Sequence, residues 1–357
     1  MLKILHAADL HLDSAFSGRS QEATARLRAA LRSVPGQIAA ICRAEQCDLL
    51  FLAGDVFDGA PAPDTLRELK RILQDLAIPT FITPGNHDFC TPASPWLTES
   101  WPENVRIFTR PVVESVAIPG LNCRVYGAGF TAMDCDSLLE NFQLQGNEAY
   151  HIAMLHGDPV QQNSPYNPVS QSQVAASKLH YLALGHVHKP GSFRAGKTLC
   201  AWPGCPMGRG FDELGEKGVL LVTVEDTAAI EFVPLNAPRF YELEAPVHTT
   251  AAAAVTDALP AVGNDDFYRI TLTGECDAPD LNALAAGFSQ FPNLELRDQT
   301  QPPVDLWGCV GNDSLEGVYF GMLKEAMESQ DEESRRIALL AAKISRKILD
   351  GGEVVLP

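Results

Sequence analysis

The chain has 357 residues, 46% hydrophobic and 20% charged, a composition typical of a globular protein with one large domain and a smaller one. Its formal net charge of −18 excludes a surface broadly coated with basic groups, although a local basic groove is compatible with it. No apolar run approaches the roughly eighteen residues of a membrane span. The nine cysteines form no C-x-x-C pair, which indicates free thiols in a reducing cytoplasm.

Up to about residue 235, apolar strands alternate with amphipathic helices. A first strand is predicted from Ile4, and further strands follow within 49–52, 78–83, 150–156 and 180–185. The stretch 64–77 has apolar residues at helical spacing, with Asp64 as a plausible N-cap. A last apolar strand in KGVLLVTVE (217–225) differs from the others because no polar side chain follows it.

A second unit is predicted after the linker-like stretch 234–244. Strands at 240–243, 267–273 and 294–297 alternate with helices at about 249–259 and 280–290, and two amphipathic helices with acidic starts follow. We therefore expect an α/β protein with domain boundaries at 1–235, 236–305 and 306–357.

The strands that precede polar stretches all deliver candidate metal ligands. The residues at their ends are Asp9 and His11, Asp55, Asn86 and His87, His156, and His186 and His188. In a sheet of roughly parallel strands, such ends gather along one edge. The set combines carboxylates, imidazoles and an amide oxygen without a thiolate, which suits manganese, iron(II) or zinc. The set is too large for one ion, so we expect two ions that share a carboxylate.

Five motifs carry a family resemblance. D-x-H (9–11), G-D-x-x-D (54–58), G-N-H-D (85–88), H-G-D (156–158) and G-H-x-H (185–188), in this order, resemble the calcineurin-like metallophosphoesterases. HAADLHLD, LAGDVFDGAPAP, YLALGHVHKP and WPGCPMGRGFDELGEKGVLLV further resemble SbcD-type DNA repair nucleases, and within them the YhaO-like branch. The resemblance covers roughly residues 1–300. It implies a sandwich of two mixed β-sheets flanked by helices, a small α/β capping domain and a helical C-terminal tail.

The resemblance also assigns roles to individual residues. It implies one ion at Asp9, His11, Asp55 and His188, and a second at Asp55, Asn86, His156 and His186, so that Asp55 bridges the two ions. Mn²⁺ is the expected metal, with Fe²⁺ or Zn²⁺ as alternatives. His87 would face the scissile phosphate and Asp58 would orient it, while metal-bound hydroxide attacks a phosphodiester in line. Asp13 and Asp88 are interpreted as turn or capping residues rather than ligands.

The resemblance implies a DNA exonuclease or endonuclease subunit. Its C-terminal helices would dock onto an SMC-like, SbcC-type ATPase, with a homodimer as a further possibility and no membrane association. Arg209 is the candidate phosphate contact, in a loop where Cys205 replaces the usual Ser. Two alternatives stay open: a phosphatase or phosphodiesterase for a nucleotide or other small phosphoester, which the acidic charge favours, and a scaffold subunit without chemistry, which the complete ligand set disfavours.

Overall fold

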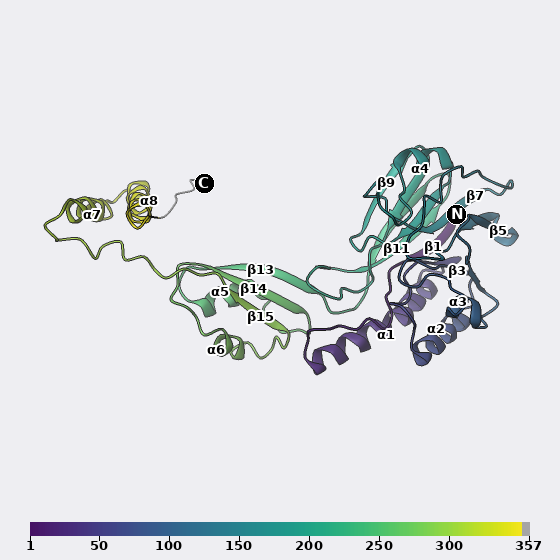
Figure 1. Ribbon diagram of the computed structural model, residues 1–357, viewed down its shortest axis with the longest axis horizontal. Coiled ribbons are helices and arrows are strands. Elements are labelled where there is room, and N and C mark those ends of the chain that lie inside the picture. Colours follow the sequence, from purple (N-terminus) through teal and green to yellow (C-terminus); the bar gives the residue numbers. More distant parts are fainter. Residues whose placement is uncertain (352–357) are drawn as a thin grey trace. The chain divides into compact units, whose positions relative to one another are not determined.

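A computed structural model describes residues 1–351 (Figure 1). The chain divides into two compact units. The first comprises residues 1–242 together with 264–269 and 291–293, and the second comprises 243–263, 270–290 and the chain from 294 onward. All the candidate site residues belong to the first unit. Within the described part of the chain, no helix has both the length and the apolarity needed to cross a bilayer.

The first unit contains two six-stranded sheets, and the first sheet has the order β12-β11-β1-β2-β3-β4. Strands β1 to β4 run parallel to one another, whereas β11 is antiparallel to β1 and β12 to β11. The bounds are Leu2–Ala7 (β1), Leu49–Ala53 (β2), Thr80–Thr83 (β3), Val105–Ile107 (β4), Gly218–Val224 (β11) and Ala228–Pro234 (β12).

The second sheet has the order β5-β6-β7-β8-β10-β9, and its four central strands are parallel. Both edge strands, β5 and β9, pair in the antiparallel direction. The bounds are Glu114–Ile118 (β5), Cys123–Gly127 (β6), Tyr150–His156 (β7), Tyr181–Gly185 (β8), Gly191–Ala195 (β9) and Thr198–Trp202 (β10).

The two sheets pack face to face around an apolar layer. Alternate residues of each strand, such as Ile4, Phe51 and Met154, point into this layer and are fully buried. The intervening residues of the first sheet pack against α1 (Gln21–Ala44) and α2 (Pro63–Leu76), and those of the second sheet pack against α4 (Gln171–Ser177). Figure 1 shows α1 and α2 on one side of the sandwich and α4 on the other. Short helices α3 (Pro95–Thr98) and η1 (Pro119–Leu121) complete the unit.

The N-terminus of α2 is capped by Asp13, a residue that lies about fifty positions earlier in the sequence. The helix begins at Pro63 with Ala62 as its N-cap residue, so Asp64 lies in the first turn and not at the expected capping position. Asp13 accepts hydrogen bonds from Ala62 N and from Thr65 Oγ1, both at 2.8 Å. Asp13 is therefore a capping residue that joins the loop after β1 to α2.

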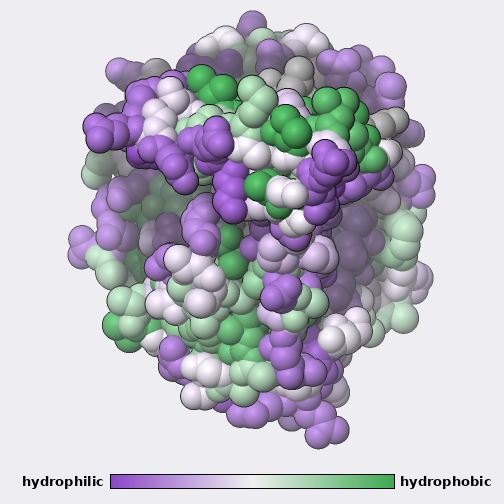
Figure 2. All heavy atoms as spheres, turned by 90° about the vertical axis from the view of Figure 1, so that its left-hand side faces the viewer, coloured by the Kyte–Doolittle hydropathy of each residue, from purple (hydrophilic) through white to green (hydrophobic). Residues whose placement is uncertain are grey.

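The second unit contains a three-stranded sheet of order β13-β14-β15 and a helical hairpin. Its elements are β13 (Phe240–Val247, which starts in the first unit), α5 (Ala251–Ala258), β14 (Phe267–Gly274), α6 (Leu281–Ala286), β15 (Leu294–Asp298), α7 (Leu315–Ala326) and α8 (Glu332–Leu349). Leu306, Phe320 and Ala342 form the small core of the hairpin. Several larger apolar side chains of α7 and α8 are exposed, and Figure 2 shows hydrophobic residues among hydrophilic ones on this face. The two mixed sheets flanked by helices, the small α/β unit and the helical tail confirm the expected fold class.

Candidate metal centre

The carboxyl ends of strands from both sheets meet at one edge of the sandwich. The backbone N–H of His186, after β8, donates to both oxygens of Asp9, after β1, at 2.9 and 3.0 Å. The ring of His156, at the end of β7, lies 3.2 Å from the carbonyl oxygen of Ala53, at the end of β2. The loops after β1, β2, β3, β7 and β8 therefore surround one site.

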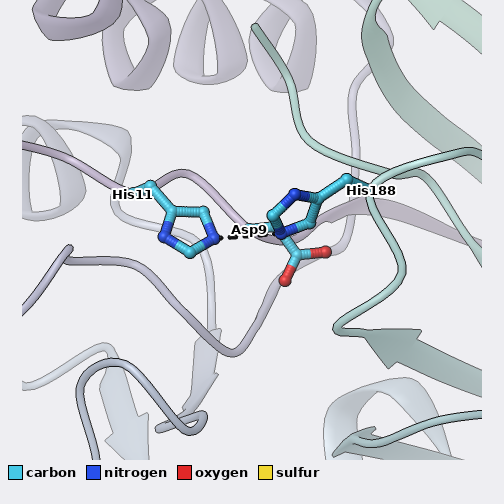
Figure 3. Close-up of side chains that lie close together, drawn as sticks. All are labelled: Asp9, His11 and His188. Carbon is cyan, nitrogen blue, oxygen red and sulfur yellow. Dashed lines mark hydrogen bonds between the residues drawn. The ribbon is translucent and has the colours of Figure 1, made fainter. Parts of the chain in front are cut away.

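His11 and His188 point toward each other within this site. Their Nε2 atoms are 3.1 Å apart, and the carboxylate of Asp9 lies beside them (Figure 3). Ligand atoms of Asp9, His11 and His188 all lie within 4.8 Å of one another. Two imidazole lone pairs repel at this separation, so either a proton or a cation has to lie between the nitrogens.

Asp55 lies centrally between two histidines that come from different sheets. Its Oδ2 atom is 3.7 Å from His11 Nε2 and 3.4 Å from His156 Nε2. Its Oδ1 atom accepts a hydrogen bond from the backbone N–H of His87 at 2.9 Å. The carboxylate is thus oriented by the backbone, with one oxygen directed to both sides of the site.

Asn86 lies between the remaining two histidines. Its Oδ1 atom is 3.0 Å from His156 Nε2 and 3.2 Å from His186 Nδ1. Asp9, Asp55 and His156 form a second group with ligand atoms within 4.8 Å of one another. The structure therefore brings together all seven residues that the sequence indicated as ligands.

The backbone around these ligands adopts conformations that most residues avoid. Asp9, His11, Asp55 and His186 have positive φ angles of 53°, 45°, 50° and 99°. Such strain is typical of functional sites, where the surrounding structure enforces it. It directs side chains inward at the point where each strand ends.

Two glycines are required by the close approach of the ligands. A Cβ atom on Gly54, whose φ is +88°, would lie 2.0 Å from His156 Nδ1. A Cβ atom on Gly85 would lie 2.2 Å from Asp55 Oδ1. Any side chain at these positions would displace a candidate ligand.

His87 lies at the open side of the site and is oriented by a carboxylate. Its ring is 44% exposed, and its Nδ1 atom is 2.9 Å from Asp58 Oδ1. The second oxygen of Asp58 accepts a hydrogen bond from Ser14 Oγ at 3.0 Å. His11, then Ser14 and His87, hold the pKa of Asp58 below its usual range despite its partial burial. Nδ1 of His87 thus has an ionised acceptor, which leaves Nε2 available to a bound molecule.

Glu213, which the sequence pattern did not indicate, lies directly behind His188. Glu213 Oε1 is 2.6 Å from His188 Nδ1, and Arg209 Nη2 donates to the same oxygen at 2.7 Å. Arg209, predicted as a phosphate contact, is therefore paired with Glu213 beside the site. Cys205 is buried, and burial raises the pKa of its thiol to about 12. Glu213 follows no strand, so the strand-end pattern gave no signal for it.

Carboxylates and imidazoles at the centre shift one another's pKa values. Burial opposes ionisation of Asp55, but His156 and His11 hold the pKa of this carboxyl below its usual range. Burial likewise lowers the pKa of His156, but Asp55 and Asp9 outweigh it and raise that pKa to about 9. Burial, then the proximity of His156, lower the pKa of His186 to about 4.

The donor set fits divalent cations. It offers nitrogen and oxygen atoms directed to a common space, with no thiolate among the convergent groups, and this mixture suits manganese, iron(II) or zinc. Nδ1 of His11 is buried without a hydrogen-bond partner among the described residues, and the nearest carboxylate oxygen, Asp58 Oδ1, lies 3.6 Å away. Asp88 does not point into the site, because its carboxylate accepts from the backbone N–H groups of Gly85, Val56 and Phe57.

Comparisons with known proteins show which family this chain belongs to. A model of the family described as calcineurin-like phosphoesterase matches residues 2–190. The chain is 34% identical over 290 residues to the uncharacterized metallophosphoesterase YhaO of Bacillus subtilis, covering 76% of this chain and 69% of that protein. It is 26% identical over 263 residues to a subunit of the nuclease SbcCD of Bacillus subtilis, covering 62% and 66%. The chain thus spans about two thirds of each relative. A solved dimetal phosphatase from Danio rerio overlaps 62% of this chain and 92% of its own, with TM-score 0.43 and 11% identity.

Proposed function

Because the chain belongs to the calcineurin-like phosphoesterase family, we propose that it is a two-metal phosphodiesterase that cleaves DNA. The observation that carries this proposal is the convergence of seven nitrogen- and oxygen-bearing side chains from five strand ends. We assign one ion to Asp9, His11, Asp55 and His188, and the other to Asp55, Asn86, His156 and His186. When bound, two divalent cations, Mn²⁺ in our proposal, would supply an activated water and neutralise charge on phosphate oxygens.

The chain's own groups would then orient the substrate and move one proton. We propose that Nε2 of His87 faces the phosphate, because Nδ1 is held by Asp58 at 2.9 Å and the ring is partly exposed. In that position the ring can donate a hydrogen bond to a phosphate oxygen or a proton to the leaving oxygen. Nδ1 directs its own proton to Asp58, so any proton given to the substrate comes from Nε2.

DNA as substrate is supported by the similarity to a nuclease subunit from Bacillus subtilis. That protein's name also refers to a complex, so we propose that this chain assembles with an SbcC-like ATPase through α7 and α8, and that it does so in the cytoplasm. The exposed apolar side chains of both helices support a role in docking.

A small phosphoester is the second candidate substrate. The formal net charge of −18 favours it, because a strongly acidic protein repels a polyanion wherever no basic groove compensates.

The test is Mn²⁺-dependent hydrolysis by the full chain, with linear DNA and bis-(p-nitrophenyl) phosphate as substrates and His87→Ala as control. Cleavage of both substrates by the native chain and of neither by the variant supports the nuclease. Hydrolysis of the small ester alone supports the second candidate. Absence of Mn²⁺-dependent hydrolysis of either substrate contradicts the proposed chemistry.

A further inference from the structure

The second ring nitrogen of His188 has a different environment from that of the other candidate histidine ligands. Glu213 Oε1 lies 2.6 Å from His188 Nδ1, which is the length of a charge-assisted hydrogen bond. The other three imidazoles have longer contacts at the corresponding nitrogen: His156 Nδ1 with Ala53 O at 3.2 Å, His11 Nδ1 with Asp58 Oδ1 at 3.6 Å, and His186 Nε2 with Asp158 Oδ2 at 4.0 Å. His188 alone thus has a short contact with a buried carboxylate.

This contact fixes the tautomer of His188. An ionised carboxylate can only accept, so Nδ1 of His188 must carry the proton that it donates to Glu213. Nε2 of His188 then presents its lone pair toward His11 Nε2, 3.1 Å away. That is the tautomer in which Nε2 can bind a cation.

Glu213 is itself held rigidly. Its side chain is 5% exposed, and its Oε2 atom accepts from the backbone N–H of Arg209 at 2.7 Å. The guanidinium of Arg209 donates to Oε1 at 2.7 Å, so the buried negative charge has a partner. Arg209 Nη2 also lies 3.2 Å from His188 Nδ1, which places a positive charge where a cation shared by His188, Cys205 and Glu213 would have to bind.

We infer that Glu213, clamped by Arg209, is a positioning residue that sets the affinity of the ion held by Asp9, His11 and His188. This inference rests on the proposed two-metal function and extends it to residues outside the ligand set. Removal of such a hydrogen-bond partner typically weakens metal binding about 10–100-fold.

Glu213→Gln is the informative substitution because glutamine has the same shape. Its single oxygen can face either Arg209 N or His188 Nδ1, but not both, and its NH₂ group must face the other. If the NH₂ group faces His188, it forces the ring proton onto Nε2 and blocks that nitrogen as a ligand. If the NH₂ group faces the backbone N–H of Arg209, two hydrogen-bond donors face each other, and the contact that holds residue 213 in place is weakened. Both arrangements weaken one metal site.

The experiment is a titration of the metal-free full chain with Mn²⁺, followed by calorimetry and electron paramagnetic resonance. The control is Glu216→Gln, because Glu216 lies in the same loop, about half exposed, and pairs with Arg239 at 2.8 Å. We expect two sites in the native chain and in the control. In Glu213→Gln we expect one of the two sites to be weakened about 10–100-fold, with a mononuclear spectrum in place of the exchange-coupled pair at intermediate Mn²⁺.

Unchanged affinities at both sites in a folded Glu213→Gln chain would overturn the inference and leave Glu213 with a structural role only. Equal weakening of both sites would also overturn it. If this variant does not fold, Arg209→Gln, which loosens Glu213 without removing it, is subject to the same criteria. A native chain that binds fewer than two Mn²⁺ ions would instead contradict the proposed function, so the two failures are distinguishable.

Discussion

Gly54 and His156 are packed so closely that a Cβ atom on the glycine would lie 2.0 Å from Nδ1 of the imidazole. Gly54 directly follows β2 of one sheet, and His156 is the last residue of β7 in the other sheet. Their contact therefore fixes both the spacing of the two sheets at the site and the position of one candidate ligand.

Gly54→Ala should therefore impair metal binding. Its methyl group would have to displace the His156 ring, so we expect loss of tight binding at one of two Mn²⁺ sites. Gly59→Ala is a matched control, because Gly59 has a φ of +89° and a Cβ atom there would meet no atom within 4 Å. Both substitutions introduce backbone strain of about 1 kcal/mol, but only Gly54→Ala should change the Mn²⁺ stoichiometry. Equal stoichiometry in the two variants would contradict the prediction.

Asp55→Asn should lose both ions rather than one. Asp55 Oδ2 lies within 4 Å of both His11 and His156, and an amide lacks the charge needed to join two cations. Asparagine can still accept the hydrogen bond from His87 N, so we expect the fold to persist. Loss of a residue that only hydrogen-bonds to a ligand weakens metal binding about 10–100-fold. Asp55 is proposed as a ligand of both ions, so we expect its replacement to weaken binding by more than about 100-fold at both sites.

The control for Asp55→Asn is Asp48→Asn, because Asp48 precedes β2 whereas Asp55 follows it. Asp48 accepts from Lys3 N at 2.8 Å, and Asp48→Asn preserves that acceptor far from the site. Metal analysis after gel filtration decides the matter: one tightly bound ion in Asp55→Asn would refute its position as the bridge.

The strand ends could be identified from the sequence, but not the sheets to which they belong. Apolar runs and the polar residues after them gave β1, β2, β3, β7 and β8, whereas the pattern alone suggested a single sheet edge. The structure distributes these strands over two sheets, because pairing depends on contacts that are distant in sequence. The two-sheet sandwich could be predicted only from the family resemblance.

Strand direction explains a feature that the sequence left open. The strand in KGVLLVTVE has no polar ending, and the structure shows that it forms β11, antiparallel to β1. Its carboxyl end therefore lies away from the site, and its start lies near it: Lys217 Nζ is 3.5 Å from the carbonyl oxygen of His188. Neither this direction nor the position of Glu213 follows from local periodicity.

His87→Asn should separate catalysis from metal binding. Ligand atoms of His87, His11 and Asp58 lie within 4.8 Å of one another, but Nδ1 of His87 is held by Asp58 at 2.9 Å and the ring is partly exposed. In our assignment His87 binds neither ion, so we expect full Mn²⁺ occupancy and a fall in kcat of about 10²–10⁴, the usual contribution of a general acid. His248→Asn, an exposed position in the second unit, is the control. A kcat within a few-fold of the native value at full occupancy would show that His87 has another role.

The helical hairpin should govern partner binding without affecting hydrolysis. Ile337 and Leu340 on α8 are 58% and 54% exposed, so charged substitutions there should not disturb the core around Phe320. We expect the double variant Ile337→Glu, Leu340→Glu to lose co-purification with an SbcC-like ATPase and to keep its hydrolysis of small phosphodiesters. Arg336→Glu, also exposed on α8, controls for the change in charge. Unchanged co-purification would exclude this face as the docking surface.

His6 should make the metal-free protein sensitive to acid. It lies fully buried between the sheets, where Nδ1 contacts Tyr181 Oη at 2.8 Å and Nε2 contacts Leu184 O at 3.1 Å. The pKa of His6 is lowered from 6.5 to about 3. Burial lowers it, and the hydrogen bond with the carbonyl oxygen of Leu184 opposes this effect only in part. Below pH 6.5 the unfolded chain binds a proton at His6 that the folded chain excludes until about pH 3. The free energy of unfolding therefore falls as the pH is lowered from 6.5 to about 3, and the contribution of His6 is complete above pH 6.5.

The size of this effect is measurable by comparison with His6→Gln. Glutamine can accept from Tyr181 and donate to Leu184, but it does not titrate. Between pH 6.5 and 4.5 the native chain should lose about 2 kcal/mol more unfolding free energy than the variant, because the slope reaches its full value of about 1.36 kcal/mol per pH unit only below pH 6.5. Urea denaturation of both metal-free proteins at these two pH values measures the difference, and other titrating groups cancel in it. Parallel losses in the two proteins would mean that His6 accepts a proton without unfolding the chain.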